Sequence, residues 1–228
     1  MIKIQNLSFS FLNHKVLNNI SIDFPKNHVF GIVGLNGAGK TTFFNVLSTY
    51  LKTKTGVITF NGSKITYKDI AYLETVNYFF SRITGNEYLK IFAQTNPDFN
   101  LNSLQEYFKL PLDDLIETYS TGMKKKLALL GVLKQNKQIF LLDEPFNGLD
   151  LETNKIVELI IETLREKGKT VFVSSHIIDP LLTVCHQIHH LENGEFIKTY
   201  EKDNFHSIED ELFKTLRSEA KTIISRSI

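Results

Sequence analysis

A glycine-rich stretch near the N-terminus has the composition and spacing of a phosphate-binding loop. Residues 34–42 read GLNGAGKTT and fit the pattern G-x-x-x-x-G-K-[ST], directly after an apolar run and before a helical pattern. Glycines let the backbone curl so that successive N–H groups point at phosphate oxygens, Lys40 supplies a point charge, and the Thr41 hydroxyl can ligate Mg²⁺. The expected binding residues are Gly34, Leu35, Asn36, Gly37, Ala38, Gly39, Lys40, Thr41 and Thr42. The alternative, a glycine-rich turn that binds nothing, is disfavoured by the strand and helix patterns on either side.

Two adjacent acids follow a second apolar run, in the stretch IFLLDEP at residues 139–145. A bound nucleoside triphosphate needs a carboxylate on its Mg²⁺, and its hydrolysis needs an activated water. We expect Asp143, at the strand end, to reach Mg²⁺ and Glu144 to accept a proton from the attacking water. Without the glycine-rich loop, this acid pair would most simply be a solvated surface.

Histidines occur at two places that merit a chemical interpretation. The stretch VFVSSH places His176 just past a strand, at the edge where open α/β sheets bind ligands, so it is a candidate hydrogen-bond donor to the γ-phosphate. Taken alone, such a histidine is more often structural. His186, His189 and His190 have no carboxylate in step with them, so we interpret their spacing as chance rather than as a metal site.

The stretch YSTGMKKK, at residues 119–126, places a hydroxyl and a glycine before an apolar helical run, LALLGVL. The N-terminus of a helix is suited to hold an anion, although a plain helix cap is the competing interpretation. Lys124, Lys125 and Lys126 are most simply a solvated basic face.

Composition indicates an ordinary globular chain of 228 residues, with 42% hydrophobic and 22% charged residues. A net charge of +1 argues against nucleic acid as the main partner. The single cysteine, Cys185, excludes an internal disulfide, fits a reducing cytosol and is expected to be a small buried hydrophobe. No apolar run approaches the length needed to cross a bilayer, and the N-terminus lacks a signal-peptide core, so we expect any membrane role to act through a partner.

Short apolar runs separated by helical patterns predict a parallel sheet with crossover helices. Strands are expected at residues 21–24, 29–33, 139–142 and 171–173, helices from Lys40 and over 156–164, and hairpins 57–67 and 188–200 around Asn61-Gly62 and Asn193-Gly194. Ser207 with Asp210 suggests a capping box before a helical stripe of Ile208, Leu212, Leu216 and Ile223. We expect one domain, with a core of residues 1–77 and 134–200, an inserted helical subdomain at 78–133, and a packed C-terminal tail at 201–228.

In this order and spacing, the motifs resemble the ATP-binding subunit of an ABC transporter over residues 2–200, in the style of the compact bacterial export-type subunit. GLNGAGKTT looks like its Walker A motif, IFLLDEP its Walker B motif with the catalytic glutamate, and YSTGM its signature loop. NGLD, ending at Asp150, looks like its D-loop, Ser175-His176 its switch histidine, and Phe11 its adenine-stacking aromatic. The resemblance implies a P-loop NTPase fold with a RecA-like, mostly parallel core, an N-terminal antiparallel β subdomain and an inserted helical subdomain.

The resemblance also implies partners and a mechanism. Two subunits, identical or paralogous, would pair head to tail around ATP and Mg²⁺, with Ser120 and Gly122 gripping the γ-phosphate of the partner's nucleotide and Asp150 nearby. Glu144 would orient the water, and Lys40 and His176 would stabilise the transferring phosphoryl group. A separate integral membrane permease would receive the motion, which places the chain in the cytoplasm on the inner face of the membrane.

The chain departs from the family pattern at two sites. Thr121 and Met123 replace a glycine and the glutamine of the signature loop. Where the family has a Mg²⁺-sensing Gln or Glu, this chain has Thr75 with Glu74 beside it, and the sequence leaves open which of the two acts.

Three other functions fit the sequence less well. A soluble ABC-type ATPase acting on nucleic acid or ribosomes typically carries tandem cassettes or long coiled coils, which do not fit here. A coupling module with impaired hydrolysis is disfavoured because Lys40, Asp143, Glu144 and His176 are all present. A small-molecule kinase would leave NGLD and YSTGM without a purpose.

Overall fold

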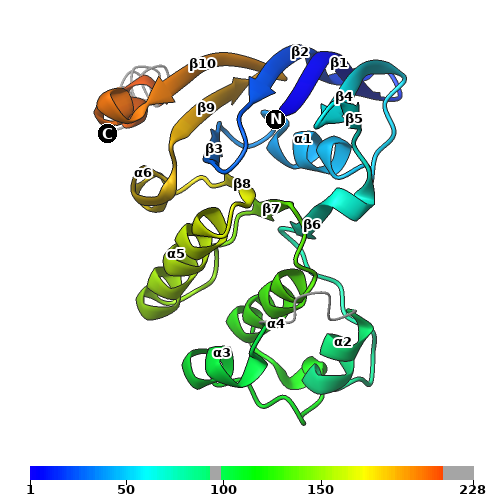
Figure 1. Ribbon diagram of the computed structural model, residues 1–228, viewed down its shortest axis with the longest axis vertical. Helices are drawn as coiled ribbons and strands as arrows, with labels where there is room; N and C mark the ends of the chain where they lie inside the picture. Colours follow the sequence, from blue (N-terminus) through cyan, green and yellow to red (C-terminus); the bar gives the residue numbers. More distant parts are fainter. Residues whose placement is uncertain (93–98, 213–228) are drawn as a thin grey trace, which may run out of the picture.

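The computed structural model describes residues 1–92 and 99–212, and its strands form two sheets (Figure 1). The first is antiparallel, in the order β2 (His14–Phe24), β1 (Ile2–Phe11), β4 (Thr55–Phe60) and β5 (Ser63–Lys64). The second has the order β10 (Glu195–Glu201), β9 (Gln187–Glu192), β3 (Val29–Val33), β8 (Thr170–Ser174), β7 (Ile139–Asp143) and β6 (Ile70–Leu73). All its pairings are parallel except β9–β10, so the predicted parallel sheet and the N-terminal antiparallel sheet are both confirmed.

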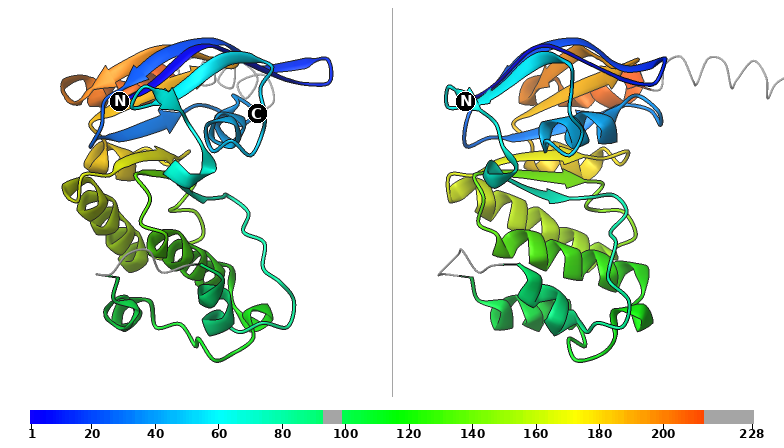
Figure 2. Two further views of the ribbon diagram at one scale, coloured as in Figure 1. Left: turned by 45° about the vertical axis from the view of Figure 1, so that its right-hand side comes forward. Right: turned by 90° about the vertical axis from the view of Figure 1, so that its right-hand side faces the viewer.

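Helices cover both faces of the six-stranded sheet. Helix α1 (Lys40–Leu47) lies between the two sheets, as both views of Figure 2 show. On the other face lie α4 (Thr121–Lys134), α5 (Leu151–Glu166) and α6 (Asp179–Val184). Between β6 and β7 the chain makes α2 (Gly85–Ile91), α3 (Leu101–Phe108) and α4, which occupy the lower end of Figure 1. Short 3₁₀ segments are η1 (Tyr67–Asp69), η2 (Ile116–Thr118) and η3 (Lys202–Ser207), and helical residues 208–212 follow η3.

Two hydrophobic cores lie on the two faces of this sheet. The core around α1 stacks aromatic rings edge to face, with Phe24 against Phe30 at 4.9 Å and against Phe172 at 4.8 Å between ring centroids. The other core joins the sheet to α4 and α5 through residues such as Leu127 and Ile161. Burying such a side chain contributes about 1.5–3 kcal/mol to the free energy of unfolding. Strands that are apolar on both faces are therefore held in place between the helices packed on each face of the sheet.

The sequence located most sheet elements but missed some boundaries. The strand at 29–33 matches β3, and those at 139–142 and 171–173 lie within β7 and β8. The prediction that residues 65–67 form the second strand of the first hairpin is wrong, because β5 ends at Lys64 and η1 follows. The Asp69 carboxylate accepts a hydrogen bond from the Thr66 N–H at 2.9 Å and so caps η1. Leu216 and Ile223 of the predicted C-terminal stripe lie outside the described residues. Cys185 is buried, as predicted.

Across residues 1–92 and 99–212, no helix is both long and apolar enough to span a membrane.

Candidate functional site

The glycine-rich loop joins β3 to α1 at the carboxyl edge of the parallel sheet. Gly37 and Gly39 have φ of 85° and 106°, which L residues with a side chain rarely adopt. A Cβ at Gly39 would also lie 3.1 Å from the carbonyl oxygen of Val16 on β2, so this position accepts only glycine without strain. Glycine-rich loops of this kind can direct backbone N–H groups at an anion, and the N-terminus of α1 that follows favours an anion.

The Lys40 side chain is buried within this loop. Its ammonium donates hydrogen bonds to the carbonyl oxygens of Gly34 at 2.7 Å and Leu35 at 3.3 Å. Burial lowers the pKa of Lys40, and the nearby charges of Glu144 and Asp143 oppose this shift by raising it. The cation of the loop and the two acids thus lie within electrostatic range of one another.

Asp143 is the centre of a hydroxyl–carboxylate arrangement at the end of β7. One carboxylate oxygen accepts from the Thr41 hydroxyl at 2.8 Å, and the other accepts from the Ser174 hydroxyl at the end of β8. Ser174 also accepts from the Glu144 N–H at 3.0 Å, so one hydroxyl positions both acids. The sequence interpretation assigned Ser174 no role. Its role depends on the pairing of β7 with β8, which places Ser174 opposite Asp143.

These donors fit a magnesium ion. Hydroxyl and carboxylate oxygens are the hard ligands that Mg²⁺ takes, with water and phosphate oxygens completing its shell. The 2.8 Å separation of the Thr41 and Asp143 oxygens brings two such ligands together from different elements, beside the loop that would hold the phosphates.

Glu144 and His176 form a pair across the ends of β7 and β8. The carboxylate lies 2.7 Å from the ring Nδ1 of His176 and 3.3 Å from its backbone N. Because an ionised carboxylate only accepts hydrogen bonds, Nδ1 must be the protonated ring nitrogen in this contact. Glu144 has φ of 51°, an uncommon value for a residue with a side chain, and such strain is often found at functional sites.

A third basic group enters the site from α4. Lys125 is only 5% exposed, and its ammonium donates to the carbonyl oxygens of Glu74 at 3.4 Å and Thr75 at 3.2 Å. Burial lowers its pKa, while Asp143 and Glu144 raise it. The prediction of a solvated face is therefore wrong for Lys125. Helical periodicity gives the reason, since Lys125 shares a face with the buried residue Leu129 four positions later.

In the segment after β6, Glu74 lies within electrostatic range of Asp143. Burial raises the pKa of Glu74, and the charge of Asp143 raises it further. The hydroxyl oxygen of Thr75 is buried without a hydrogen-bond partner among the described residues. Of the two residues left open by the sequence, Glu74 is the one whose pKa is affected by the charge of Asp143.

Ser120 and Gly122 lie at the N-terminus of α4, and Gly122 lies close to the segment that leads into α5. The Ser120 hydroxyl accepts from the Met123 N–H at 3.2 Å, which is a helix cap. A Cβ at Gly122 would lie 3.1 Å from the carbonyl oxygen of Gly148. Asp150 caps α5, accepting from Thr153 N at 2.7 Å, and its carboxylate lies 3.9 Å from the ammonium of Lys126.

The predicted site residues thus form two groups. Lys40, Thr41, Asp143, Glu144 and His176 meet at the carboxyl edge of the parallel sheet. Ser120, Gly122 and Asp150 gather around the α4–α5 contact, and Figures 1 and 2 show α4 separated from α1 by strands of that sheet.

Phe11 ends β1, is 49% exposed and meets the ring of Phe9 edge to face at 4.9 Å. Further along the same hairpin, the Val16 carbonyl oxygen lies close to Gly39 of the glycine-rich loop, 3.1 Å from the position that a Cβ of residue 39 would take. A half-exposed ring on this hairpin is able to stack on a planar group.

Two of the other histidines singled out, His186 and His189, have structural contacts. His189 is buried, which lowers its pKa to about 4, and its Nδ1 lies 2.9 Å from the Thr199 hydroxyl. The Nδ1 of His186 accepts from Val29 N at 3.2 Å. Residues 1–92 and 99–212 contain no group of three His, Cys, Asp or Glu side chains placed to hold a metal ion.

Comparisons with known proteins agree with this chemistry. The family model described as "ABC transporter" matches residues 17–147, more than half of the chain. The ABC transporter ATP-binding protein YtrB of Bacillus subtilis is 27% identical over 212 residues, covering 89% of this chain and 73% of YtrB. A solved ATP-binding subunit of an ABC transporter has a similar fold, with a TM-score of 0.82, 22% identity and coverage of 92% and 93%. The ATP-binding cassette MJ0796, solved as a dimer in a post-hydrolysis state with ADP and Pi, has a TM-score of 0.76, 20% identity and coverage of 89% and 99%.

Proposed function

This chain belongs to the ABC transporter family, and we propose that two such subunits, identical or paralogous, enclose ATP head to tail. The chain is the ATP-binding and ATP-hydrolysing subunit. The observation that carries the proposal is the separation of its two anion-binding features. The Lys40 loop lies beside the hydrolytic groups at the sheet edge, whereas the α4 tip at Ser120, with its N-terminal dipole, belongs to a helix that strands of the sheet separate from α1. Head-to-tail pairing supplies each with the other, and the cassette MJ0796 is known as a dimer.

Each group has a proposed role at the nucleotide. The loop at residues 34–42 would hold the phosphates, Phe11 would stack on the adenine, and Ser120, Gly122 and Asp150 of the opposite subunit would close the site. Thr41 and Asp143 would hold Mg²⁺, which when bound neutralises phosphate charge.

Glu144 is the proposed base for the attacking water. Its contact with His176 fixes the carboxylate and leaves the ring Nε2 facing away from Glu144. While Nδ1 donates to Glu144, Nε2 donates to a phosphate oxygen only in the imidazolium form, because a neutral ring carries one N–H. His176 would therefore both orient the base and, when charged, stabilise the transferring phosphoryl group.

A surface for the membrane partner is proposed on the segment between β6 and α2. Val76, Tyr78 and Phe80 are 61%, 85% and 69% exposed, and clustered exposed apolar side chains mark interaction sites. Lys125 ties the start of this segment to α4, which carries Ser120. We propose that the inserted helices at 78–133 act as a subdomain that carries motion from the nucleotide to a permease at the inner face of the membrane.

Mixing two inactive variants tests the head-to-tail arrangement. Lys40→Ala loses the phosphate cradle, and Ser120→Arg blocks the α4 tip. In a mixed dimer, the Ser120→Arg loop meets the intact tip of the Lys40→Ala subunit, so one complete site is restored. We expect the mixture to hydrolyse ATP although each variant alone does not. If Ser120 acts on the loop of its own chain, the mixture will be as inactive as its components, and the proposal fails.

A further inference from the structure

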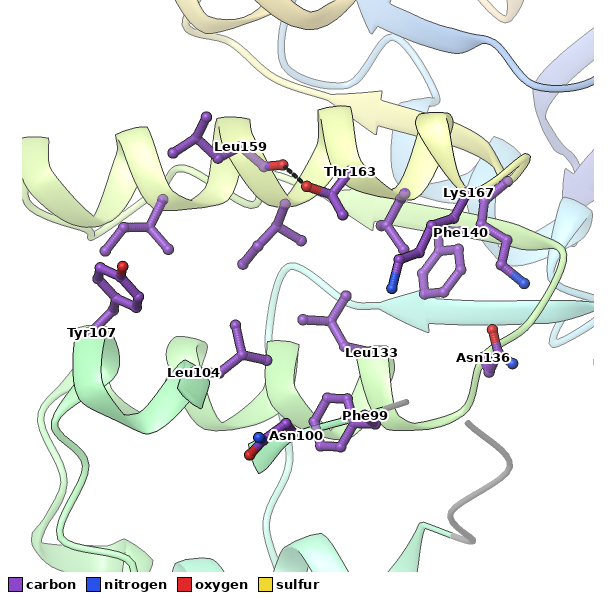
Figure 3. Close-up of a pocket in the computed structure, with 14 residues that line it drawn as sticks. Phe99, Asn100, Leu104, Tyr107, Leu133, Asn136, Phe140, Leu159, Thr163 and Lys167 are labelled. Atoms are coloured by element: carbon purple, nitrogen blue, oxygen red, sulfur yellow. Dashed lines mark hydrogen bonds between the residues drawn. The ribbon is translucent and has the colours of Figure 1, made fainter. Parts of the chain in front are cut away.

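An apolar cavity of about 430 Å³ lies between α3, α4 and α5, away from the nucleotide site. Figure 3 shows α5 above it and α3 and α4 below, with Tyr107 at one end and Lys167, Phe140 and Asn136 at the other. The apolar lining includes Leu104, Leu133, Phe140, Ile156, Ile160 and Leu164. This volume falls in the range of small-molecule pockets, and none of the proposed nucleotide-binding residues lines it.

Two lysines line this mostly apolar cavity, Lys169 at a buried position and Lys167 at an exposed one. Lys169 is only 8% exposed, and among the described residues neither its ammonium nor that of Lys167 has a hydrogen bond or ion pair. Burial lowers the pKa of Lys169, and the charge of Lys167 lowers it further, so the two cations are close enough to repel. Burying the charge of Lys169 without a partner is costly, and an anion bound beside its ammonium would offset that cost, with the exposed Lys167 adding a second positive charge.

The remaining polar groups do not supply this anion. The Thr163 hydroxyl is already used, donating to the Leu159 carbonyl oxygen at 2.7 Å on its own helix, as the dashed line in Figure 3 shows. Asn136 lies at the same end as Lys167 and offers an amide, which is neutral. The cavity therefore combines a cationic end with an apolar body.

We propose that this cavity binds a single-chain carboxylate amphiphile, a fatty-acid anion, with its carboxylate on Lys169 and Lys167 and its chain among the leucine and isoleucine side chains. A small hydrophilic anion would leave the apolar lining unfilled, and a neutral hydrocarbon would leave the lysines unpaired. Because α4 carries Ser120 at its other end, an amphiphile wedged between α4 and α5 would contact the helix that also forms the nucleotide site.

Calorimetric titration of the full chain with decanoate and with decanol, both below their micelle concentrations, tests the head-group assignment. We expect decanoate to bind wild type at least tenfold more tightly than decanol. The reason is that a hydrogen bond between two charged groups contributes at least the free energy that corresponds to a tenfold ratio of dissociation constants. Lys169→Met should remove that preference and leave decanol binding unchanged. Lys90→Met, which removes an exposed lysine of α2, should keep it.

Two further readouts separate the outcomes. Ile160→Phe fills the cavity and should weaken both ligands, and ATP affinity of Lys169→Met should equal that of wild type. Equal affinity of wild type for decanoate and decanol, an undiminished decanoate preference in Lys169→Met, or unchanged binding by Ile160→Phe would each overturn the proposal. Absence of any binding would do the same, including the case in which the cavity accepts only a side chain from a partner protein.

Discussion

Replacing Lys125 by methionine should separate stability from catalysis. Methionine keeps the buried stem but removes the ammonium that holds the carbonyl oxygens of Glu74 and Thr75. We expect ATP turnover to fall at least tenfold, equivalent to about 1.4 kcal/mol in the activation barrier, because Glu74 and the α4 tip lose their shared anchor. Protein stability, in contrast, should hardly change.

The stability estimate follows from two opposing contributions. Hydrogen bonds from a charged donor contribute about 1.5–3 kcal/mol, and at 3.2 and 3.4 Å the two bonds together are worth about 2 kcal/mol. Burying an ammonium costs an amount of the same order or larger, which is why burial lowers the pKa of Lys125. The free energy of unfolding should therefore change by no more than about 1 kcal/mol, with a tendency to rise.

The lowered pKa of Lys125 also predicts how the stability change caused by Lys125→Met depends on pH. A lysine whose pKa is lowered by folding destabilises the folded state below that lowered pKa, and the penalty disappears as pH rises toward the ordinary value of 10.5. Any stability gained by Lys125→Met should thus be greatest near neutral pH and shrink in alkali.

Urea unfolding and steady-state ATPase assays measure the two effects. Lys124→Met, a change on the same helix at a partly exposed position, is the matched control and should alter neither. A Lys125→Met protein that loses several kcal/mol of stability, or one that keeps full turnover, would refute the reasoning.

Three other substitutions test separate parts of the site. Glu144→Gln should retain ATP binding but stop water activation, so gel filtration with ATP should show a stable dimer; a variant that stays monomeric at high concentration would count against the ATP-enclosed pair. Ser120→Arg should abolish turnover while ATP affinity of the monomer stays within about twofold, and equal losses in equilibrium binding and turnover would place Ser120 at its own chain's loop. Gly194→Ala should cost about 2–3 kcal/mol in urea unfolding, since Gly194 has φ of 78° and a Cβ there would lie 2.2 Å from the Val16 carbonyl oxygen; a neutral effect would mean that the β9–β10 turn yields easily.

The fold was predictable where one local signal decided it. Short, nearly continuous apolar runs predicted β3, β7 and β8, because a strand buried on both faces is apolar at most positions. The loop between residues 64 and 70 was not predictable in the same way. Its η1 turn depends on a side-chain cap between Thr66 and Asp69, which competes with strand pairing and leaves no hydrophobic pattern.

Some residues of the candidate site were likewise predictable from the sequence and others were not. Residues in fixed motifs could be named from spacing alone, since the strand–loop–helix context sets their position. Lys125 and Ser174 could not, because each acts through tertiary contacts with segments 30 or more residues away. The contact of His176 with Glu144 also required the structure, as it depends on the parallel register that places Asp143 opposite Ser174.

The contact between Gly122 and Gly148 has a consequence for timing. Gly148 is four positions after Glu144 in the chain, a span of at most about 14 Å even when fully extended. In the proposed pair, Gly148 thus lies close to Gly122, which would contact one nucleotide, and in the same short turn as Glu144, the proposed base for the other. A rotation of the α4 N-terminus at Gly122 should therefore shift the main chain from Gly148 to Glu144, and a shift of Glu144 should move the α4 N-terminus. We expect hydrolysis of one nucleotide to influence hydrolysis of the other.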